Sequence, residues 1–368
     1  MRFPGFKNSW DCTILEKLSK KIGDGIHSTP SYDDDGTFYF INGNNLNRGK
    51  IVITSSTKRV SEKEAYKNNA ENLEADSILM SINGTIGNVA LYNNEPIMLG
   101  KSACYINSKD NVDKKFLFYY LQYPKTQSYF ETELTGTTIK NLSLQSIRKT
   151  KICIPTIEEQ HKISHFLQKI DERIATQNKI IEKLETLIKG IRNNIISKIK
   201  GDCIVLQDIA DIYQPQTIAS TDLTEDGYLV YGANGIIGKY HSFNHEKEQI
   251  CITCRGNTCG TVNFTEPKSW ITGNAMVINT DNYAKNVNKR YLFHYLSSIN
   301  FNSIISGSGQ PQIVRQPLAK LKLILPVLII QNRIAECLDA MFAKMKNEQS
   351  FLQILQIQKS CLLSQMFI

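Results

Sequence analysis

The feature that most constrains this 368-residue chain is an internal repeat. The stretch GTTIKNLSLQSIRKTKICIP, from Gly136 to Pro155, aligns without a gap with GSGQPQIVRQPLAKLKLILP, from Gly307 to Pro326, at a shift of 171 residues. Both stretches have the pattern of a glycine turn, a polar loop and a strand that ends at proline. Repetition on this scale indicates two copies of one structural unit.

Three further blocks occur upstream of these stretches, in the same order in both halves. They are SILMSINGTIGNV (77–89) with QICITCRGNTCGTV (249–262), KSACYI (101–106) with GNAMVI (273–278), and FLFYYL (116–121) with YLFHYL (291–296). Small changes of offset between the blocks indicate insertions and deletions in surface loops. The chain is therefore predicted to be a duplicated domain, each copy followed by a helix, with domains at 1–155 and 201–326 and helices at 156–200 and 327–368.

Both predicted helices carry apolar residues at alternating spacings of four and three, which is the spacing of a heptad seam. Polar Gln177 and Glu348 interrupt the two seams at equivalent positions. Thr156 and Glu159 at the start of the first helix are spaced as a capping box. The residues predicted to pair the helices are Ile163, Leu167, Ile170, Ile174, Ile181, Leu184 and Ile188 in the first, and Ile334, Leu338, Met341, Met345, Leu352 and Leu355 in the second.

A single apolar seam needs a partner, and the nearest partner for each helix is its own repeat. A twofold relation between the copies would pair the helices antiparallel. The predicted fold class is α+β, with two pseudo-repeated domains joined and separated by two long antiparallel coiled-coil helices. Two alternatives stay open, in which each seam packs on its own domain or forms a coiled coil between two chains.

Composition sets loose limits on function. The first residues lack an apolar stretch of signal-peptide length and no segment approaches the run of about 20 apolar residues that spans a membrane, so a cytoplasmic protein is expected. Nine cysteines scattered along the chain favour reduced thiols over a disulfide framework. The net charge of +8 is spread along the chain instead of forming a basic tail, so it permits polyanion binding without demonstrating it.

One cluster approaches the spacing of zinc ligands. The repeat argues against a zinc site, because the cysteines of this cluster align with Leu79, Ile82 and Ile86 of the first copy, where the framework requires apolar side chains. Motifs of a methyltransferase or of a serine or cysteine triad are missing, so we predict a binding protein with no catalytic residues and no metal. The residues of the cluster are His241, His245, Cys251, Cys254 and Cys259.

Several motifs resemble those of the DNA specificity subunit of type I restriction-modification systems, and the likeness covers nearly the whole chain. These motifs are RFPGF near the start, GDGIHSTPSY, SILMSINGTIG, IPTIEEQHKI and the closing LLSQMF. YLVYGANGIIGKY and RGNTCGTV in the second domain resemble another class of recognition domain of that family. The second copy departs from the family pattern Pro-x-x-x-Glu-Gln, because Ile330 replaces the glutamate.

The resemblance implies a non-catalytic subunit with two target recognition domains, each reading half of a split DNA site, while paired helices set the spacing. It also implies two methyltransferase subunits that bind S-adenosylmethionine and restriction subunits driven by ATP, and none of these cofactors is expected on this chain. The two domains differ in their loops, so the site should be asymmetric. The alternatives are a recognition subunit of another restriction-modification class, a two-headed scaffold that binds proteins, and an enzyme acting alone.

Base recognition requires side chains that form paired hydrogen bonds in the major groove, with other donors on the phosphates. The framework glycines mark the loops that could carry them. The predicted DNA-binding residues are Lys58, Arg59, Asn83, Thr85, Thr137, Thr138, Lys140 and Asn141 in the first domain, and Tyr231, Asn234, Lys239, Arg255, Asn257, Ser308, Gln310, Gln312 and Arg315 in the second.

Overall fold

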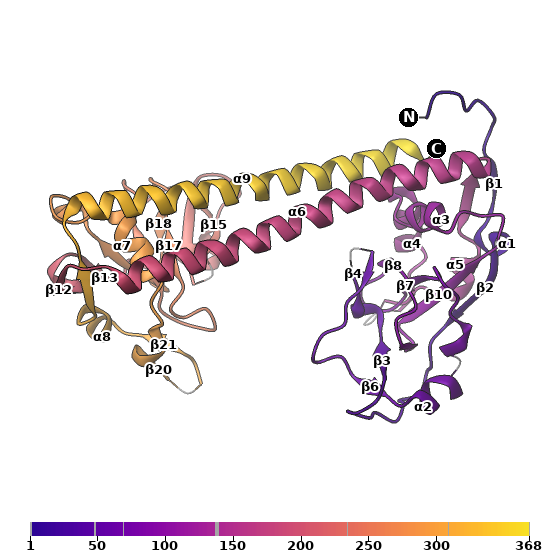
Figure 1. Cartoon of the computed structure of the whole chain (residues 1–368), viewed down its shortest axis with the longest axis horizontal. Helices are drawn as coiled ribbons and strands as arrows, with labels where there is room; N and C mark the ends of the chain where they lie inside the picture. Colours follow the sequence, from indigo (N-terminus) through magenta and orange to yellow (C-terminus); the bar gives the residue numbers. More distant parts are fainter. Residues whose placement is uncertain are drawn as a thin grey trace. The chain divides into compact units, whose positions relative to one another are not determined.

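The computed structural model describes residues 2–47, 49–68, 70–136, 140–233, 235–307 and 309–367 (Figure 1). The chain divides into two compact units. Unit 1 comprises residues 1–177 and 351–368, and unit 2 comprises residues 178–350. Each unit therefore contains one copy of the sequence repeat together with a half of each long helix.

Unit 1 is built on a four-stranded antiparallel sheet in the order β2-β10-β7-β8 and a three-stranded sheet in the order β6-β3-β9, in which β3 and β9 are parallel. Strand pairs β1-β11 and β4-β5 complete it. The strands are β1 (Asp11–Ile14), β2 (Ser19–Asp24), β3 (Phe38–Ile41), β4 (Leu46–Asn47), β5 (Lys50–Ile51), β6 (Arg59–Val60), β7 (Ile78–Ser81), β8 (Val89–Leu91), β9 (Ile97–Leu99), β10 (Ala103–Ser108) and β11 (Lys151–Ile154). The helices are α1 (Leu15–Leu18), η1 (Gly43–Asn45), α2 (Glu62–Lys67), η2 (Ala70–Asn72), α3 (Lys114–Leu121), α4 (Pro124–Thr132) and α5 (Leu144–Arg148).

Unit 2 repeats this topology, with a four-stranded sheet in the order β13-β19-β16-β17 and a three-stranded sheet in the order β15-β14-β18. The matching strand orders confirm the repeat inferred from the sequence. The strands are β12 (Asp202–Val205), β13 (Asp211–Tyr213), β14 (Tyr228–Gly232), β15 (Gly235–Tyr240), β16 (Ile250–Thr253), β17 (Val262–Phe264), β18 (Trp270–Ile271), β19 (Ala275–Asn279), β20 (Ile305–Ser306), β21 (Gln312–Ile313) and β22 (Lys322–Leu325). The helices are η3 (Leu206–Asp208), η4 (Ser220–Asp222), η5 (Asp281–Tyr283), α7 (Lys289–Leu296), η6 (Phe301–Ile304) and α8 (Arg315–Ala319).

The central strands β7 and β16 are buried on both faces, which explains their continuous apolar sequences. Ile78 and Met80 of β7 pack in the core that contains α3, whereas Leu79 packs with β3 and β9. In unit 2, Ile252 of β16 packs with α7 and Cys251 packs with β14 and β18. Each unit therefore stacks a helix, a four-stranded sheet and a three-stranded sheet.

Two long helices, α6 (Ile157–Lys198) and α9 (Leu328–Met366), follow the strands that end at Pro155 and Pro326 (Figure 1). Within unit 1, Asp171 of α6 forms an ion pair of 2.7 Å with Lys359 of α9. Nearer the start of α6, Ile163 shares a core with Leu363, which lies nearer the end of α9. Residue numbers rise along α6 as they fall along α9, so the helix halves in unit 1 are antiparallel.

The predicted seam residues are all buried or half-buried, and three of them, Ile163, Leu167 and Ile334, pack on the adjoining domain. Ile163 and Leu167, for example, belong to the core that contains α3. Those that are buried are Ile163, Leu167, Ile170, Ile181, Ile188, Leu338 and Leu355, and those that are half-buried are Ile174, Leu184, Ile334, Met341, Met345 and Leu352.

The start of α6 differs from the predicted capping box. Arg2, at the opposite end of the domain sequence, donates from Nε and Nη2 to the two carboxylate oxygens of Glu159, each at 2.7 Å. Thr156 instead forms a hydrogen bond with Glu158, whose pKa is lowered by its own backbone N–H and by this hydroxyl. The sequence spacing could not show this, because the partner of Glu159 lies 157 residues away.

A buried glutamine joins the start of each long helix to the domain. Gln160 donates to the Pro155 carbonyl at 2.8 Å and accepts from the Asp113 backbone N–H at 3.0 Å. Gln331, its repeat equivalent, donates to the Pro326 carbonyl at 2.8 Å and accepts from the Asn288 N–H at 2.8 Å. These glutamines therefore fix each strand end to the cap of α3 or α7.

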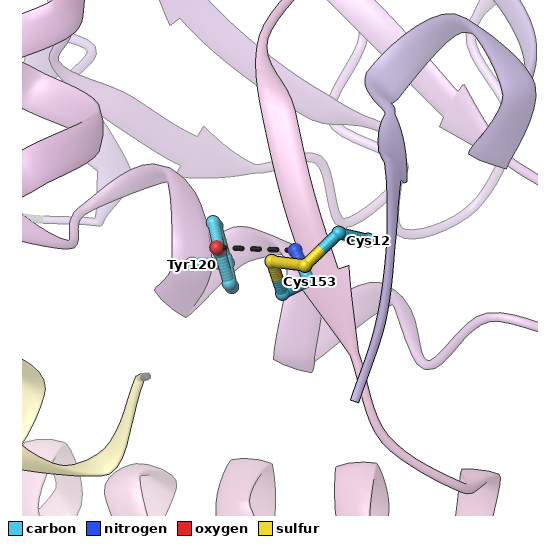
Figure 2. Close-up of a disulfide and its surroundings, with 3 residues drawn as sticks. All are labelled: Cys12, Tyr120 and Cys153. Atoms are coloured by element: carbon cyan, nitrogen blue, oxygen red, sulfur yellow. Dashed lines mark hydrogen bonds between the residues drawn. A yellow bond between two sulfur atoms is a disulfide. The ribbon is translucent and has the colours of Figure 1, made fainter. Parts of the chain in front are cut away.

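A disulfide between Cys12 and Cys153 corrects the expectation that the cysteines are all reduced thiols (Figure 2). The register of β1 and β11 sets these residues directly opposite each other, with their Cα atoms 4.0 Å apart. The Cys153 backbone N–H donates to the Tyr120 hydroxyl at 3.1 Å, as Figure 2 shows. A separation of 141 residues in sequence concealed this pairing.

Across the part of the chain that the structure describes, the helices all fall short of the length and apolar character needed to cross a membrane.

Candidate nucleic-acid interface

In unit 1, two turns meet at one end of the four-stranded sheet. The turn after β7 pairs with the polar loop before α5 through a bridge between Asn83 and Asn141, supported by a hydrogen bond of 2.9 Å from the Leu142 N–H to the Ile82 carbonyl. Thr135 and Asn141 exchange backbone hydrogen bonds of 3.0 and 2.9 Å across the loop. Segments more than 50 residues apart in sequence therefore form one surface.

Unit 2 repeats this arrangement at the equivalent positions. Arg255 and Gln312 form the bridge, and the Ile313 N–H donates to the Cys254 carbonyl at 3.0 Å. The pair β20-β21 closes the loop, with Ser306 opposite Gln312. The structure thus brings together the glycine turns and polar loops that sequence comparison had matched.

Glycines shape the tips of these turns. Gly84 has φ 74° and Gly256 has φ 85°, values in the left-handed region that favours glycine. A β-carbon at either position would meet nothing within 4 Å. The requirement for glycine is therefore conformational, and the space beside each turn is open to a ligand.

Around the turns of unit 1, the exposed Lys140 lies next to Asn141, and Thr85 donates to the Gly43 carbonyl at 3.5 Å. Asn83 donates through Nδ2 to the Lys101 carbonyl at 3.3 Å. The exposed Lys101 was missed in the sequence analysis, because only the tertiary fold brings the β9-β10 turn beside Asn83.

Lys58 and Arg59 lie on the edge of the three-stranded sheet instead of at the turns. The Arg59 guanidinium lies 5.0 Å from the centre of the Tyr39 ring and donates to its hydroxyl at 3.4 Å. Lys58 lies 6.0 Å from the centre of the Tyr32 ring. Cation–π contacts of this kind hold the two basic side chains over aromatic rings while leaving them exposed.

In unit 2, Arg255, Asn257 and Gln310 are exposed, and Gln312 is half-buried. Thr137, Thr138, Asn234 and Ser308 lie outside the described residues.

Tyr231 is 5% exposed, and its hydroxyl accepts from the Glu266 N–H at 3.1 Å. Tyr231 is therefore a core residue and not a surface residue that contacts DNA bases. Arg315 donates from Nε to the Ile212 carbonyl at 2.6 Å, which fixes α8 to β13. Lys239 forms an ion pair of 3.7 Å with Asp226.

The cysteines considered as zinc ligands lie in apolar surroundings. Cys251 and Cys254 are fully buried at the positions of Leu79 and Ile82. Burial raises the pKa of Cys251 to about 12 and also raises the pKa of Cys254, so both remain protonated thiols at neutral pH. His245 is buried and bonded to Tyr213 and Asn244. Groups of three or more metal-ligating side chains do not occur among the described residues.

Comparison with known proteins identifies the family. The pattern of the family described as "Type I restriction modification DNA specificity domain" matches residues 15–186 and again 203–356. This chain belongs to that family. It carries two copies of the specificity domain and is a non-catalytic DNA-recognition subunit.

Two curated relatives agree with this assignment. The Type I restriction enzyme EcoprrI specificity subunit of Escherichia coli is 25% identical over 309 residues, which are 78% of this chain and 75% of that protein. The putative type I restriction enzyme MjaX specificity subunit of Methanocaldococcus jannaschii is 32% identical over 128 residues, 34% of this chain and 29% of that protein.

Solved structures share the fold. The type I restriction-modification S subunit from M. genitalium matches with a TM-score of 0.62 at 18% identity, covering 100% of this chain and 99% of that one. A chain from a study of complex assembly and conformational transition in the type I R-M system matches with a TM-score of 0.58 at 15% identity, covering 97% of both chains.

Proposed function

We propose that this specificity subunit reads a bipartite, asymmetric DNA site. The paired turns of each unit read one half of the site. The observation that carries the proposal is that the same backbone frame presents different side chains in the two copies. Unit 1 presents Asn83, Lys101 and Lys140, whereas unit 2 presents Arg255 and Gln310 at its turns. The backbone of the paired turns is alike in the two units, but the hydrogen-bond donors that they expose differ. Such a difference is what recognition of two half-sites of different sequence requires.

The proposed contacts divide by chemistry. Arg255, Asn257 and Gln310 can form paired hydrogen bonds with base edges in the major groove. Lys101 and Lys140 are better suited to phosphates, as are Lys58 and Arg59 on the neighbouring sheet edge. The Thr85 hydroxyl already donates to the Gly43 carbonyl, so its role is to hold the turn in place. Asn141 and Gln312 form their bridges through backbone atoms, as Asn83 and Arg255 do, so their side chains can still turn to the DNA.

Salt dependence tests the phosphate contacts and separates DNA recognition from protein scaffolding. We expect affinity for duplex DNA to fall steeply with added salt, and Lys101→Gln or Lys140→Gln to reduce the slope of log K against log salt by about 0.9 each. Lys109→Gln is the matched control, because Lys109 is exposed beyond the opposite end of β10. An unchanged slope in both turn variants would exclude these residues from the interface.

We further propose that two methyltransferase subunits, and restriction subunits with them, dock on the long helices. Support comes from large apolar side chains exposed on α9 in unit 1, where Ile354 is 59% and Ile357 is 65% exposed, and on α6 in unit 2, where Leu187 is 55% exposed. Apolar side chains clustered on an exposed helix face often mark a protein interface. Ile357→Glu should abolish co-purification with the methyltransferase subunit, whereas Gln358→Glu, at an exposed polar position beside it, should not.

A further inference from the structure

The Cys12–Cys153 disulfide adjoins a basic, aromatic cavity in unit 1. This cavity of about 330 Å³ is lined by Cys153 together with three tyrosines, three lysines and two threonines. The lysines are exposed and take part in none of the ion pairs formed by the described residues. The lining residues include no carboxylate. The tyrosines are Tyr120, Tyr123 and Tyr129, and the lysines are Lys125, Lys149 and Lys151.

We propose that Cys12–Cys153 is a reversible thiol–disulfide site whose exchange partner is a small thiol carrying carboxylates, bound in this cavity. The lysine ammonium groups supply the countercharge for the carboxylates. The tyrosine rings form an apolar floor, and the volume lies at the lower end of the range for small-molecule sites. A partner with excess positive charge would be repelled by the same three lysines.

The exchange proceeds in two balanced steps. The bound thiolate attacks Sγ of Cys153, which lines the cavity, forming a mixed disulfide while Cys12 leaves as a thiolate. Cys12 is exposed, so its thiolate is solvated and takes up a proton from water. A second molecule of the small thiol then attacks the mixed disulfide, releasing Cys153 as a thiol and the partner as its own disulfide. Two partner thiols are oxidised and one protein disulfide is reduced.

Reduction would remove the covalent link between β1 and β11 without unfolding the domain, because other contacts hold the N-terminal segment. Arg2 is bonded to Glu159, the Phe3 ring packs edge-on against Phe166 at 5.8 Å, and Trp10 packs against Phe116 at 5.9 Å. Figure 2 shows the disulfide beside the Tyr120 hydroxyl, which accepts a hydrogen bond from the Cys153 backbone N–H and not from a sulfur atom.

Unit 2 supplies an internal comparison. Cys203 of β12 faces Ile324 of β22, the position equivalent to Cys153, so this copy has one sulfur and no disulfide. The Ile324 N–H donates to the Tyr295 hydroxyl at 3.0 Å, as Cys153 does to Tyr120. Lys320 and Lys322 repeat Lys149 and Lys151 and are also exposed. The two lysines beside the strand thus occur in both units, while the disulfide next to them is found in unit 1.

The test measures reduction of the oxidised full-length chain by three thiols of different charge: glutathione with excess negative charge, neutral 2-mercaptoethanol and cationic cysteamine. Rates are expressed per concentration of thiolate. Electrostatic attraction can raise association rates by about 10-fold or more. We expect the glutathione-to-cysteamine rate ratio to fall by about 10-fold in the combined Lys125→Gln, Lys149→Gln and Lys151→Gln variant, and to fall with added salt in the wild type.

The matched control combines Lys320→Gln with Lys322→Gln, which should leave the ratio unchanged. Peptide mapping of the oxidised chain should show Cys12 linked to Cys153 while Cys203 is alkylated as a free thiol. Two results would overturn the proposal: alkylation of Cys12 as complete as that of Cys203 under oxidising conditions, or a rate ratio in the triple lysine variant equal to that of the wild type.

Discussion

Replacing Gln331 with alanine tests how the long helices are joined to the domains. The Gln331 side chain is fully buried and forms three hydrogen bonds with backbone groups: it accepts from Asn288 and donates to the carbonyls of Pro326 at 2.8 Å and Asn286 at 2.9 Å. At about 1 kcal/mol per hydrogen bond, Gln331→Ala should lower the free energy of unfolding of unit 2 by about 3 kcal/mol. Gln160→Ala removes two such bonds and should cost unit 1 about 2 kcal/mol.

The two tryptophans of the chain make the assay specific to each unit, because Trp10 lies in unit 1 and Trp270 in unit 2. In a Trp10→Phe background, urea denaturation followed by fluorescence reports unit 2. In a Trp270→Phe background it reports unit 1. Gln349→Ala is the control, since Gln349 is an exposed glutamine of α9 in unit 2. A loss of less than about 1 kcal/mol for Gln331→Ala, similar to that of the control, would show that the Gln331 side chain does not join the helix to the domain.

Three further predictions concern pH, the start of α6 and the helix length. Burial lowers the pKa values of His245 and His294, so below about pH 6.5 the unfolded state binds protons that the folded state does not. The Trp270 transition should move to lower urea between about pH 7 and pH 5, and His245→Gln combined with His294→Gln should flatten this dependence. Arg2→Ala leaves the Glu159 carboxylate buried without its partner and should destabilise unit 1 more than Glu159→Gln does, as measured through Trp10. Insertion of one heptad between Gln177 and Leu184, and another between Glu348 and Leu355, lengthens each helix by about 10 Å and should widen the unspecified gap in the DNA site by about three base pairs with both half-sites unchanged.

The repeated fold could be predicted from the sequence because its signals are local and duplicated. The glycine turn, the strand ending at proline and the heptad spacing each occur twice, so a match at one position supports the match at the next. Comparison of the copies also assigned Cys251 and Cys254 to the core, where the structure places them.

Contacts between distant segments could not be predicted in this way. The Arg2–Glu159 pair and the Cys12–Cys153 disulfide join the start of a domain to its end, and neither has an equivalent in the second copy that would reveal it. Tyr231 was assigned to the surface because it precedes a glycine turn, but the end of β14 is buried on both faces and Tyr231 packs with Cys251 and Ile271 in the core. Lys101 was missed because its proximity to Asn83 depends on the pairing of β7 with β10.

If each unit reads its own half-site, mapping of methylated adenines should show the contribution of each unit separately. The chain would be combined with its methyltransferase subunit, and the methylated motif of the wild type compared with that of Arg255→Ala and of Asn83→Ala. Arg255→Ala should relax the sequence requirement in one half-site, at a cost of about 1–3 kcal/mol for the base involved, while the other half and the gap stay intact. Asn83→Ala should affect the opposite half alone. Relaxation of the same half-site by both variants, or a motif unchanged in both, would show that the two units do not read separate half-sites through these residues.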